Sequence, residues 1–299
     1  MTFSHDIADY PEGIVLPIDK PWRWTSADVI RKVKYAAIKH FRKKNLKVGH
    51  AGTLDPLATG VLLVCIGPAC KRAQEFQDHD KEYEAVVRFG ATTPSYDLEK
   101  EVDRTFPYYH VTEEAVRAVL PSFIGTQEQV APLFSAKSVD GVRAYEMARK
   151  MYRNAQKGIV DPDFDAAALE TLHHSTITIH ELELLDFYPA VNPAKVTGDG
   201  LSSASLRDPI QANAPESPSS SGTASSRIHF TDTSALGLPE ARIRIACSKG
   251  TYIRALARDL GEALGTGAHL GALVRTKTGA FRLEDALSLD QALALLAED

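Results

Sequence analysis

The chain has 299 residues, of which 44% are hydrophobic and 24% are charged, and its formal net charge is −5. This composition is typical of a soluble globular protein and excludes a wholly disordered, collagen-like or membrane-spanning chain. The N-terminus lacks the apolar core of a signal peptide. The chain has three cysteines without metal-ligand spacing, which is typical of reduced thiols. We therefore expect a cytoplasmic protein.

Periodic apolar residues predict the elements in chain order. The first is a helix from Thr25 to about Lys44, with Thr25 as N-cap and Asp28 completing a capping box. Strands are predicted at 61–66, 83–89, 176–185 and 241–247, and further helices at 112–120, 253–264 and 289–297. Because the elements alternate without a regular βαβ rhythm, the pattern indicates an α+β fold.

The chain divides unevenly. We expect a catalytic domain over residues 1–287 and a C-terminal helix over residues 288–299. Residues 191–226 interrupt this domain: 16 of these 36 residues are Ser, Pro or Gly, and none is aromatic. Such a segment cannot bury enough apolar area to offset the entropy lost on ordering, so we predict a disordered insertion.

Positive charge is concentrated in two segments. Residues 20–47 hold ten Lys or Arg and one acid, and residues 242–282 hold eight against two acids. Together these segments predict a basic face on an acidic protein, of the kind that binds nucleic acid. The alternative is two solvated surfaces without a partner.

The most unusual stretch is the glycine-rich loop GHAGTLDPLATG at residues 49–60. Asp55 lies in its middle, before a proline that restricts the aspartate to extended backbone. An Asx-turn is the alternative role for this side chain. No second carboxylate suggests a glycosidase pair, and no metal-ligand spacing or phosphate-binding loop is present. The pattern favours a reaction that uses one carboxylate, with no metal and no cofactor.

Five segments follow one another along the chain: LPIDKP at 16–21 with Thr25-Ser26; the loop at 49–60; DKEY at 80–83; residues 134–149; and CSKGTYIR at 247–254, followed by GAHL at 267–270. In this order they resemble the motifs of the TruB family of tRNA pseudouridine synthases. The likeness covers nearly the whole chain outside the insertion, and the second and fifth segments match at almost every position.

The resemblance implies the pseudouridine-synthase fold, a mixed and largely antiparallel sheet with flanking helices and a central catalytic cleft. It implies that uridine 55 in the T-loop of tRNA is converted to pseudouridine, with the T-arm as partner, no membrane and no small-molecule cofactor. We expect a monomer. Only 20 residues follow Gly279, so we expect no C-terminal PUA domain of the kind that many members carry.

The resemblance also implies roles for single residues. Asp55 matches the catalytic nucleophile, Arg254 the arginine that pairs with it, and Tyr83 the tyrosine that stacks on the target base. In addition, Tyr252, His50 and Lys20 match substrate-binding positions. Taken singly, these residues have other roles open to them. Tyr83 and Tyr252 could simply pack in the core, His50 could be a turn residue, and Arg254 and Lys20 could be surface cations.

Some positions depart from the family pattern. Arg23 stands where a glycine is usual, Lys137 lies one place early in its motif, and residues 92–97 keep only Thr93 and Asp97 of theirs. These departures leave the RNA contacts near Lys137 and Asp97 open. Two other functions compete: the same chemistry on another RNA, and a folding chaperone that binds tRNA without catalysis. The Asp55, Tyr83 and Arg254 set favours catalysis.

Overall fold

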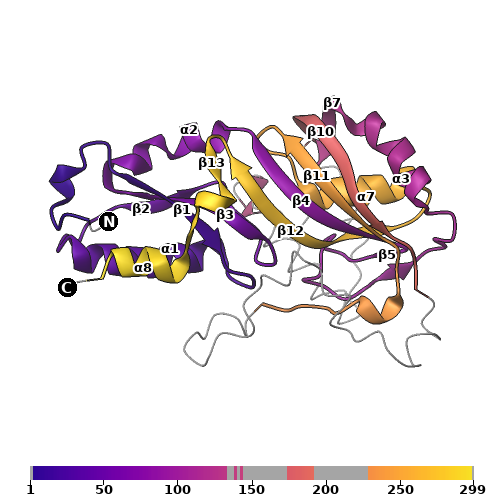
Figure 1. Ribbon diagram of the computed structural model, residues 1–299, viewed down its shortest axis with the longest axis horizontal. Helices are drawn as coiled ribbons and strands as arrows, with labels where there is room; N and C mark the ends of the chain where they lie inside the picture. Colours follow the sequence, from indigo (N-terminus) through magenta and orange to yellow (C-terminus); the bar gives the residue numbers. More distant parts are fainter. Residues whose placement is uncertain (1–2, 133–137, 140–141, 144–173, 192–227, 298–299) are drawn as a thin grey trace.

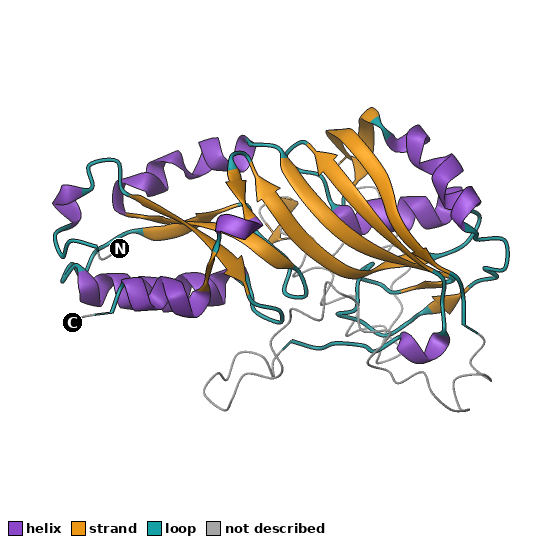
Figure 2. Ribbon diagram, viewed as in Figure 1, coloured by secondary structure: helices purple, strands orange, loops and turns teal. Residues whose placement is uncertain are grey.

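The computed structural model describes residues 3–132, 138–139, 142–143, 174–191 and 228–297. Among these residues, ten strands form one mixed sheet in the order β14-β1-β3-β12-β4-β11-β10-β7, with β13 beside β12 and β2 beside β3. Figure 1 shows that this sheet runs along the length of the molecule, with both termini at the same end. Figure 2 shows helices at both ends of the sheet.

The sheet is largely antiparallel, as predicted, since only the β1–β14 and β3–β12 pairs are parallel. Two short two-stranded sheets, β5–β6 and β8–β9, lie apart from it. The strands of the main sheet are β1 (Ile14–Lys20), β2 (Val48–Ala51), β3 (Thr59–Ile66), β4 (Lys81–Phe89), β7 (Gly125–Val130), β10 (His174–Tyr188), β11 (Glu240–Cys247), β12 (Ala268–Thr278), β13 (Phe281–Arg282) and β14 (Leu287–Ser288). Those of the small sheets are β5 (Ala91–Thr92), β6 (Arg104–Thr105), β8 (Ser138–Val139) and β9 (Val142–Arg143).

The described helices are α1 (Ser26–His40), α2 (Ala73–Asp78), α3 (Glu113–Val119), α7 (Ile253–Ala263) and α8 (Leu289–Leu295). The capping box of Thr25 and Asp28 is present, so the predicted start of α1 is confirmed. The predicted end near Lys44 is wrong. The helix stops at His40 because Arg42 adopts a left-handed backbone with φ 51°, which cannot continue a right-handed helix.

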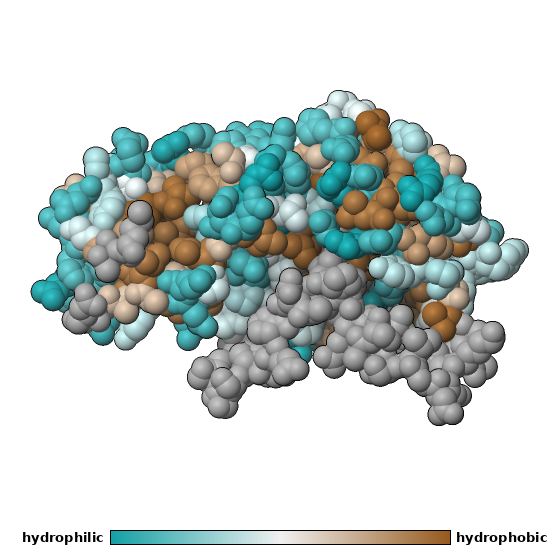
Figure 3. Space-filling model, viewed as in Figure 1, coloured by the Kyte–Doolittle hydropathy of each residue, from teal (hydrophilic) through white to brown (hydrophobic). Residues whose placement is uncertain are grey.

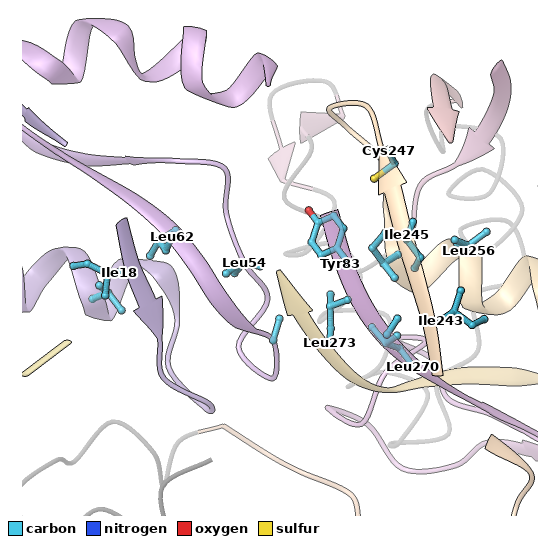
Figure 4. Packing of buried hydrophobic residues seen from close by; sticks show 14 of the residues in the cluster. Ile18, Leu54, Leu62, Tyr83, Ile243, Ile245, Cys247, Leu256, Leu270 and Leu273 are labelled. Carbon is cyan, nitrogen blue, oxygen red and sulfur yellow. The ribbon is translucent and has the colours of Figure 1, made fainter. Parts of the chain in front are cut away.

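The main apolar core lies between the sheet and helices at its two ends, and a second, smaller cluster includes Val61, Leu63 and Phe76. At one end α1 and α8 pack against each other and α8 against β1, and at the other α7 packs against β12 and β4. Figure 4 shows Ile18 and Leu62 from the first region and Ile243 and Leu256 from the second. This arrangement leaves the loop between β2 and β3 at the junction of the two regions, where the catalytic residues were predicted.

The predicted basic face is wrong for residues 242–282. Arg242 pairs with Glu84 at 2.7 Å, Arg244 pairs with Glu183, and four further cations outside the predicted catalytic set have carboxylate partners. Arg242, Arg244 and Lys277 meet acids on neighbouring antiparallel strands, and Lys249, Arg258 and Arg282 pair with acids on helices or nearby in the chain. Figure 3 shows hydrophilic residues interspersed with hydrophobic ones over the central strands. The cations along α1 and the turn that follows it stay exposed: Arg31, Lys32, Lys34, Lys39, Arg42, Lys43, Lys44 and Lys47.

The family's glycine position is occupied here by Arg23, and the structure gives a reason. Arg23 has φ 61°, a conformation that glycine adopts freely and other residues rarely adopt. Its guanidinium lies 5.5 Å from the centroid of the Trp22 ring and donates to the carbonyl oxygen of Ile228. These contacts offset the backbone strain of the left-handed conformation.

The predicted insertion at 191–226 lies outside the described residues except for Val191, whose amide donates to the carbonyl of Gly237 at 3.0 Å. The helix predicted at 289–297 is present over Leu289–Leu295 as α8, with its own capping box between Ser288 and Gln291. No helix in the described part of the chain is long and apolar enough to cross a membrane.

Candidate active site

A cavity of about 480 Å³ opens where the β2–β3 loop, β4 and the start of α7 meet. Four of the six predicted site residues line it: Asp55, Tyr83, Tyr252 and Arg254. The central cleft expected from the sequence is therefore present. The other two, Lys20 and His50, are not among the described residues that line the cavity.

Asp55 and Arg254 form a two-pronged ion pair. Arg254 Nε donates to Asp55 Oδ2 at 2.9 Å, and Arg254 Nη2 donates to Oδ1 at 3.2 Å. The Arg254 side chain is 6% exposed, whereas the Asp55 side chain is 38% exposed. The carboxylate is thus held from behind by the guanidinium and can still be reached from the cavity.

Arg254 belongs to the first turn of α7, whose apolar face anchors it in the core. Its Nη1 donates to the carbonyl of Ser95 at 3.1 Å, and its Nε lies 3.7 Å from Asp97 Oδ2. Burial lowers the pKa of Arg254, but the negative charges of Asp55, Asp97 and Glu99 outweigh burial and raise it. The guanidinium therefore stays charged next to Asp55.

The loop that carries Asp55 is fixed by side chains from β1 and α1. Ser26 Oγ accepts from the Leu54 amide at 3.0 Å and donates to the Leu54 carbonyl at 3.1 Å. Asp19 Oδ1 accepts from the Gly60 amide at 3.0 Å. These bonds hold the residue before Asp55 and the end of the loop, so the carboxylate is positioned before any substrate binds.

Lys20 lies beneath this loop and is fully buried. Its Nζ donates to the carbonyl oxygens of Pro21, Trp24 and Pro56, the last at 3.2 Å. Burial lowers the pKa of Lys20 to about 7, an effect that the nearby charge of Asp55 opposes. In this structure Lys20 ties the loop to the β1–α1 turn, and its contact with substrate stays a prediction.

His50 lies on β2, with its ring partly buried. Its Nδ1 atom is buried and has no hydrogen-bond partner in the described part of the chain. Burial lowers the pKa of His50, and the charge of Arg275 lowers it further. The structure does not bring His50 to the cavity wall, and its predicted role also stays untested.

Tyr83 projects from β4 and is 8% exposed. Figure 4 shows its ring beside Ile245 and near Leu273, with the hydroxyl directed away from Leu270. Burial raises the pKa of the phenol, and Arg275 opposes that rise. A neutral ring with apolar neighbours and one polar end is suited to stacking on a base.

Tyr252 is the residue before α7, and Gln129 on β7 holds its backbone from both sides. The Tyr252 amide donates to Gln129 Oε1 at 2.8 Å, and Gln129 Nε2 donates to the Tyr252 carbonyl at 3.1 Å. These bonds fix the chain at the point where it enters the helix that carries Arg254.

Three further residues of the site were not predicted. Asp97 and Glu99 lie in the segment that departs from the family motif, and burial raises the pKa of Asp97 and raises that of Glu99 to about 7. The sequence did carry one signal for these two carboxylates, because Asp97 keeps the residue expected at its place in the motif. Arg275, which lines the cavity from β12, had no signal beyond a cation within an apolar strand. The described residues contain no cluster of His, Cys, Asp or Glu that could hold a metal ion.

Comparison with solved structures shows the fold. The chain in a structure titled "Crystal Structure of a Cbf5-Nop10-Gar1 Complex" is similar with a TM-score of 0.54 and 22% identity, covering 96% of this chain and 56% of that chain. This chain thus spans about half the length of that neighbour. The architecture is the pseudouridine-synthase fold.

Comparison with sequences defines the family. The model described as "TruB family pseudouridylate synthase (N terminal domain)" matches residues 39–161, and "tRNA pseudouridylate synthase B C-terminal domain" matches residues 254–299. A Phocaeicola vulgatus protein named tRNA pseudouridine synthase B is 44% identical, covering 94% of this chain and 92% of its own. A Bacteroides thetaiotaomicron protein of the same name is also 44% identical, over 93% and 91%. This chain belongs to the TruB family of pseudouridylate synthases.

Proposed function

We propose that this enzyme converts uridine 55 in the T-loop of tRNA to pseudouridine, with Asp55 as the nucleophile. The observation that carries the proposal is the two-pronged pair of Asp55 with the buried Arg254, because it fixes the carboxylate at the edge of a cavity and leaves it accessible. The names of its relatives support tRNA as the substrate.

The chemistry needs few groups. The bond between ribose C1′ and uracil N1 breaks, the uracil turns, and a bond between C1′ and C5 replaces it. C5 loses a proton and N1 gains one, so the product is an isomer of the substrate. An ionised Asp55 supplies the electron pair that stabilises or attacks the sugar as the first bond breaks. Arg254 binds both oxygens of that carboxylate and places a positive charge beside it, and Tyr83 stacks on the detached base so that the base stays in the cavity.

The target uridine lies within a folded loop, so the enzyme extrudes it before reaction, at a cost of a few kcal/mol. Contacts with the phosphates of the T-arm would offset that cost, and the exposed cations of α1 and the turn after it could make them, among them Lys32, Lys34 and Lys43. We propose that a monomer makes all of these contacts, since Asp55, Tyr83, Tyr252 and Arg254 of a single chain suffice to line the cavity together.

The test is Asp55→Asn, which keeps the shape of the side chain and removes its charge. We expect pseudouridine formation on a tRNA transcript to be abolished while tRNA affinity is retained, with both measured on one preparation. Asp290→Asn, an exposed carboxylate on α8, is the matched control and should behave as wild type. Residual turnover within about tenfold of wild type, a barrier change of about 1.4 kcal/mol, would exclude Asp55 as nucleophile.

A further inference from the structure

Arg275 occupies a junction in the sheet. It lies on β12, where its Cα is paired with Gly60 of β3 on one side and with Tyr83 of β4 on the other. A register shift follows at once, between Arg275 and Lys277. Irregularities of this kind re-aim a side chain, and they occur often beside active sites.

The side chain of Arg275 contacts both ends of the catalytic loop. It is 2% exposed, its Nε donates to the Val61 carbonyl at 2.7 Å, and its Nη2 donates to the Gly52 carbonyl at 2.8 Å. These two carbonyls lie on opposite sides of Asp55 in the chain. One planar guanidinium therefore bridges the point where the loop leaves β2 and the point where it joins β3.

The loop fits closely against Arg275 at two glycines. Gly52 has φ +78°, and a Cβ added there would lie 3.4 Å from Arg275 Nη1. Gly60 has φ +98°, and a Cβ there would lie 2.2 Å from the Arg275 carbonyl oxygen. Both glycines adopt backbone that other residues rarely adopt, and at Gly60 a side chain would also overlap β12.

Arg275 is a buried cation that has no carboxylate as counter-ion among the described residues. No carboxylate lies within ion-pair distance of it in the described part of the chain, although every other buried arginine there has one. A buried cation without a counter-ion is costly, and an apolar side chain could fill the same space at lower cost. Holding two carbonyls at fixed positions is what an apolar side chain could not do.

We propose that Arg275 is a positioning residue for pseudouridine formation: it clamps both ends of the loop that carries Asp55 and sets that loop against Tyr83. The inference rests on the proposed function of Asp55. Arg275 acts through the loop by the hydrogen bonds of its Nε and Nη2 to backbone carbonyls, and its guanidinium also lies beside the Tyr83 side chain. A shift of the loop by about 1 Å would cost about a hundredfold in rate.

The test is Arg275→Lys, which keeps the charge but replaces the planar fork by a point donor that cannot bridge both carbonyls. We expect the single-turnover rate to fall about a hundredfold, tRNA affinity to be retained, and the melting temperature to fall only slightly. Arg88→Lys is the matched control. Arg88 is also buried and lies on β4, but it bonds Glu240 and Thr233 away from the cavity, so its variant should keep the wild-type rate.

A second readout does not depend on activity. Hydrogen exchange of the backbone amides in residues 52–60 should be faster in Arg275→Lys and unchanged in Arg88→Lys. Failure of the wild-type protein to modify tRNA would refute the proposed function, and amide exchange would still decide whether Arg275 holds the loop. A wild-type rate, unchanged exchange in the loop, or a rate that falls only with the folded fraction would overturn the proposal.

Discussion

At the scale of single residues, the site depends on where its charges are buried. Arg254 is almost fully enclosed, whereas the carboxylate it binds reaches the cavity. A lysine at this position would keep one positive charge but would lose the two parallel hydrogen bonds and the bond to the Ser95 carbonyl. The geometry of the donor, and not only its charge, should therefore decide the activity.

Arg254→Lys should lower the single-turnover rate about a hundredfold, equivalent to about 2.7 kcal/mol in the barrier, while the protein stays folded. The measurement is single-turnover kinetics on a tRNA T-arm together with thermal melts. Arg117→Lys is the control, because Arg117 pairs with Glu113 on the exposed surface of α3 and should matter little. A near-wild-type rate for the Arg254 variant would show that the pairing does not contribute to catalysis.

A second residue predicts a pH dependence of stability. His269 is fully buried, with Nδ1 2.9 Å from the Ala91 carbonyl, and burial lowers its pKa to about 4. Its ordinary value is about 6.5, so between these two values the unfolded chain binds a proton that the folded chain does not. His269 therefore costs the folded state more stability as the pH falls from about 6.5 to about 4, by up to about 3 kcal/mol.

His269→Asn removes this titration and can keep the donor to the Ala91 carbonyl. Urea unfolding of both proteins at pH 7 and at pH 4.5 gives the free energy of unfolding. The wild-type value should fall more steeply with acid than that of the variant. Parallel falls in the two proteins would show that His269 titrates normally in the folded state.

The sequence predicted the residues that line the active site better than the residues that hold them in position. Asp55, Tyr83, Tyr252 and Arg254 could be selected because each lies in a short motif, and all four meet at one cavity. The contribution of Arg275 could not be predicted. Its role depends on two carbonyls that are far from it in the chain, and backbone carbonyls have no sequence signature.

At the scale of elements, the contact between β3 and β12 connects the catalytic loop to the rest of the sheet. The two strands are parallel and share only the partners Val274–Thr59 and Arg275–Gly60. The approach is close because Gly60 has no side chain. A methyl group there would have to displace backbone, which is far more costly than displacing a flexible side chain.

Gly60→Ala should therefore destabilise the protein by more than about 2 kcal/mol, from the strained positive φ and the overlap with β12. Gly49→Ala on β2, just before the loop, is the control, since Gly49 has no neighbour within 4 Å of an added Cβ and no positive φ. Denaturant unfolding of both variants gives the comparison. Equal stability of the two would mean that β12 does not constrain the loop.

Element prediction succeeded where local signals were complete. Capping residues located α1 and α8, and alternation located β4 and β11. β12 was not predicted, because it is buried on both faces for much of its length and carries Arg275 and His269 among its apolar residues. Its place between β3 and β4 depends on long-range pairing that periodicity does not report.

At the scale of the whole molecule, charge along the chain differs from charge on the surface. Both positive segments looked alike in the sequence, yet antiparallel pairing neutralised one and left the other exposed on α1 and the turn after it. Net charge within a window does not reveal which acids will lie opposite it. Binding of tRNA through the exposed segment should weaken as salt increases.

The central claim is that the Asp55 loop and α7 together modify one uridine in the T-loop of tRNA. The most direct test is to map pseudouridine in tRNA from cells that lack this protein, complemented either with the wild-type chain or with Asp55→Asn. We predict that pseudouridine at position 55 is absent without the protein, returns with the wild-type chain, and does not return with the variant. Restoration by Asp55→Asn, or an unchanged position 55 in the deletion strain, would contradict the account.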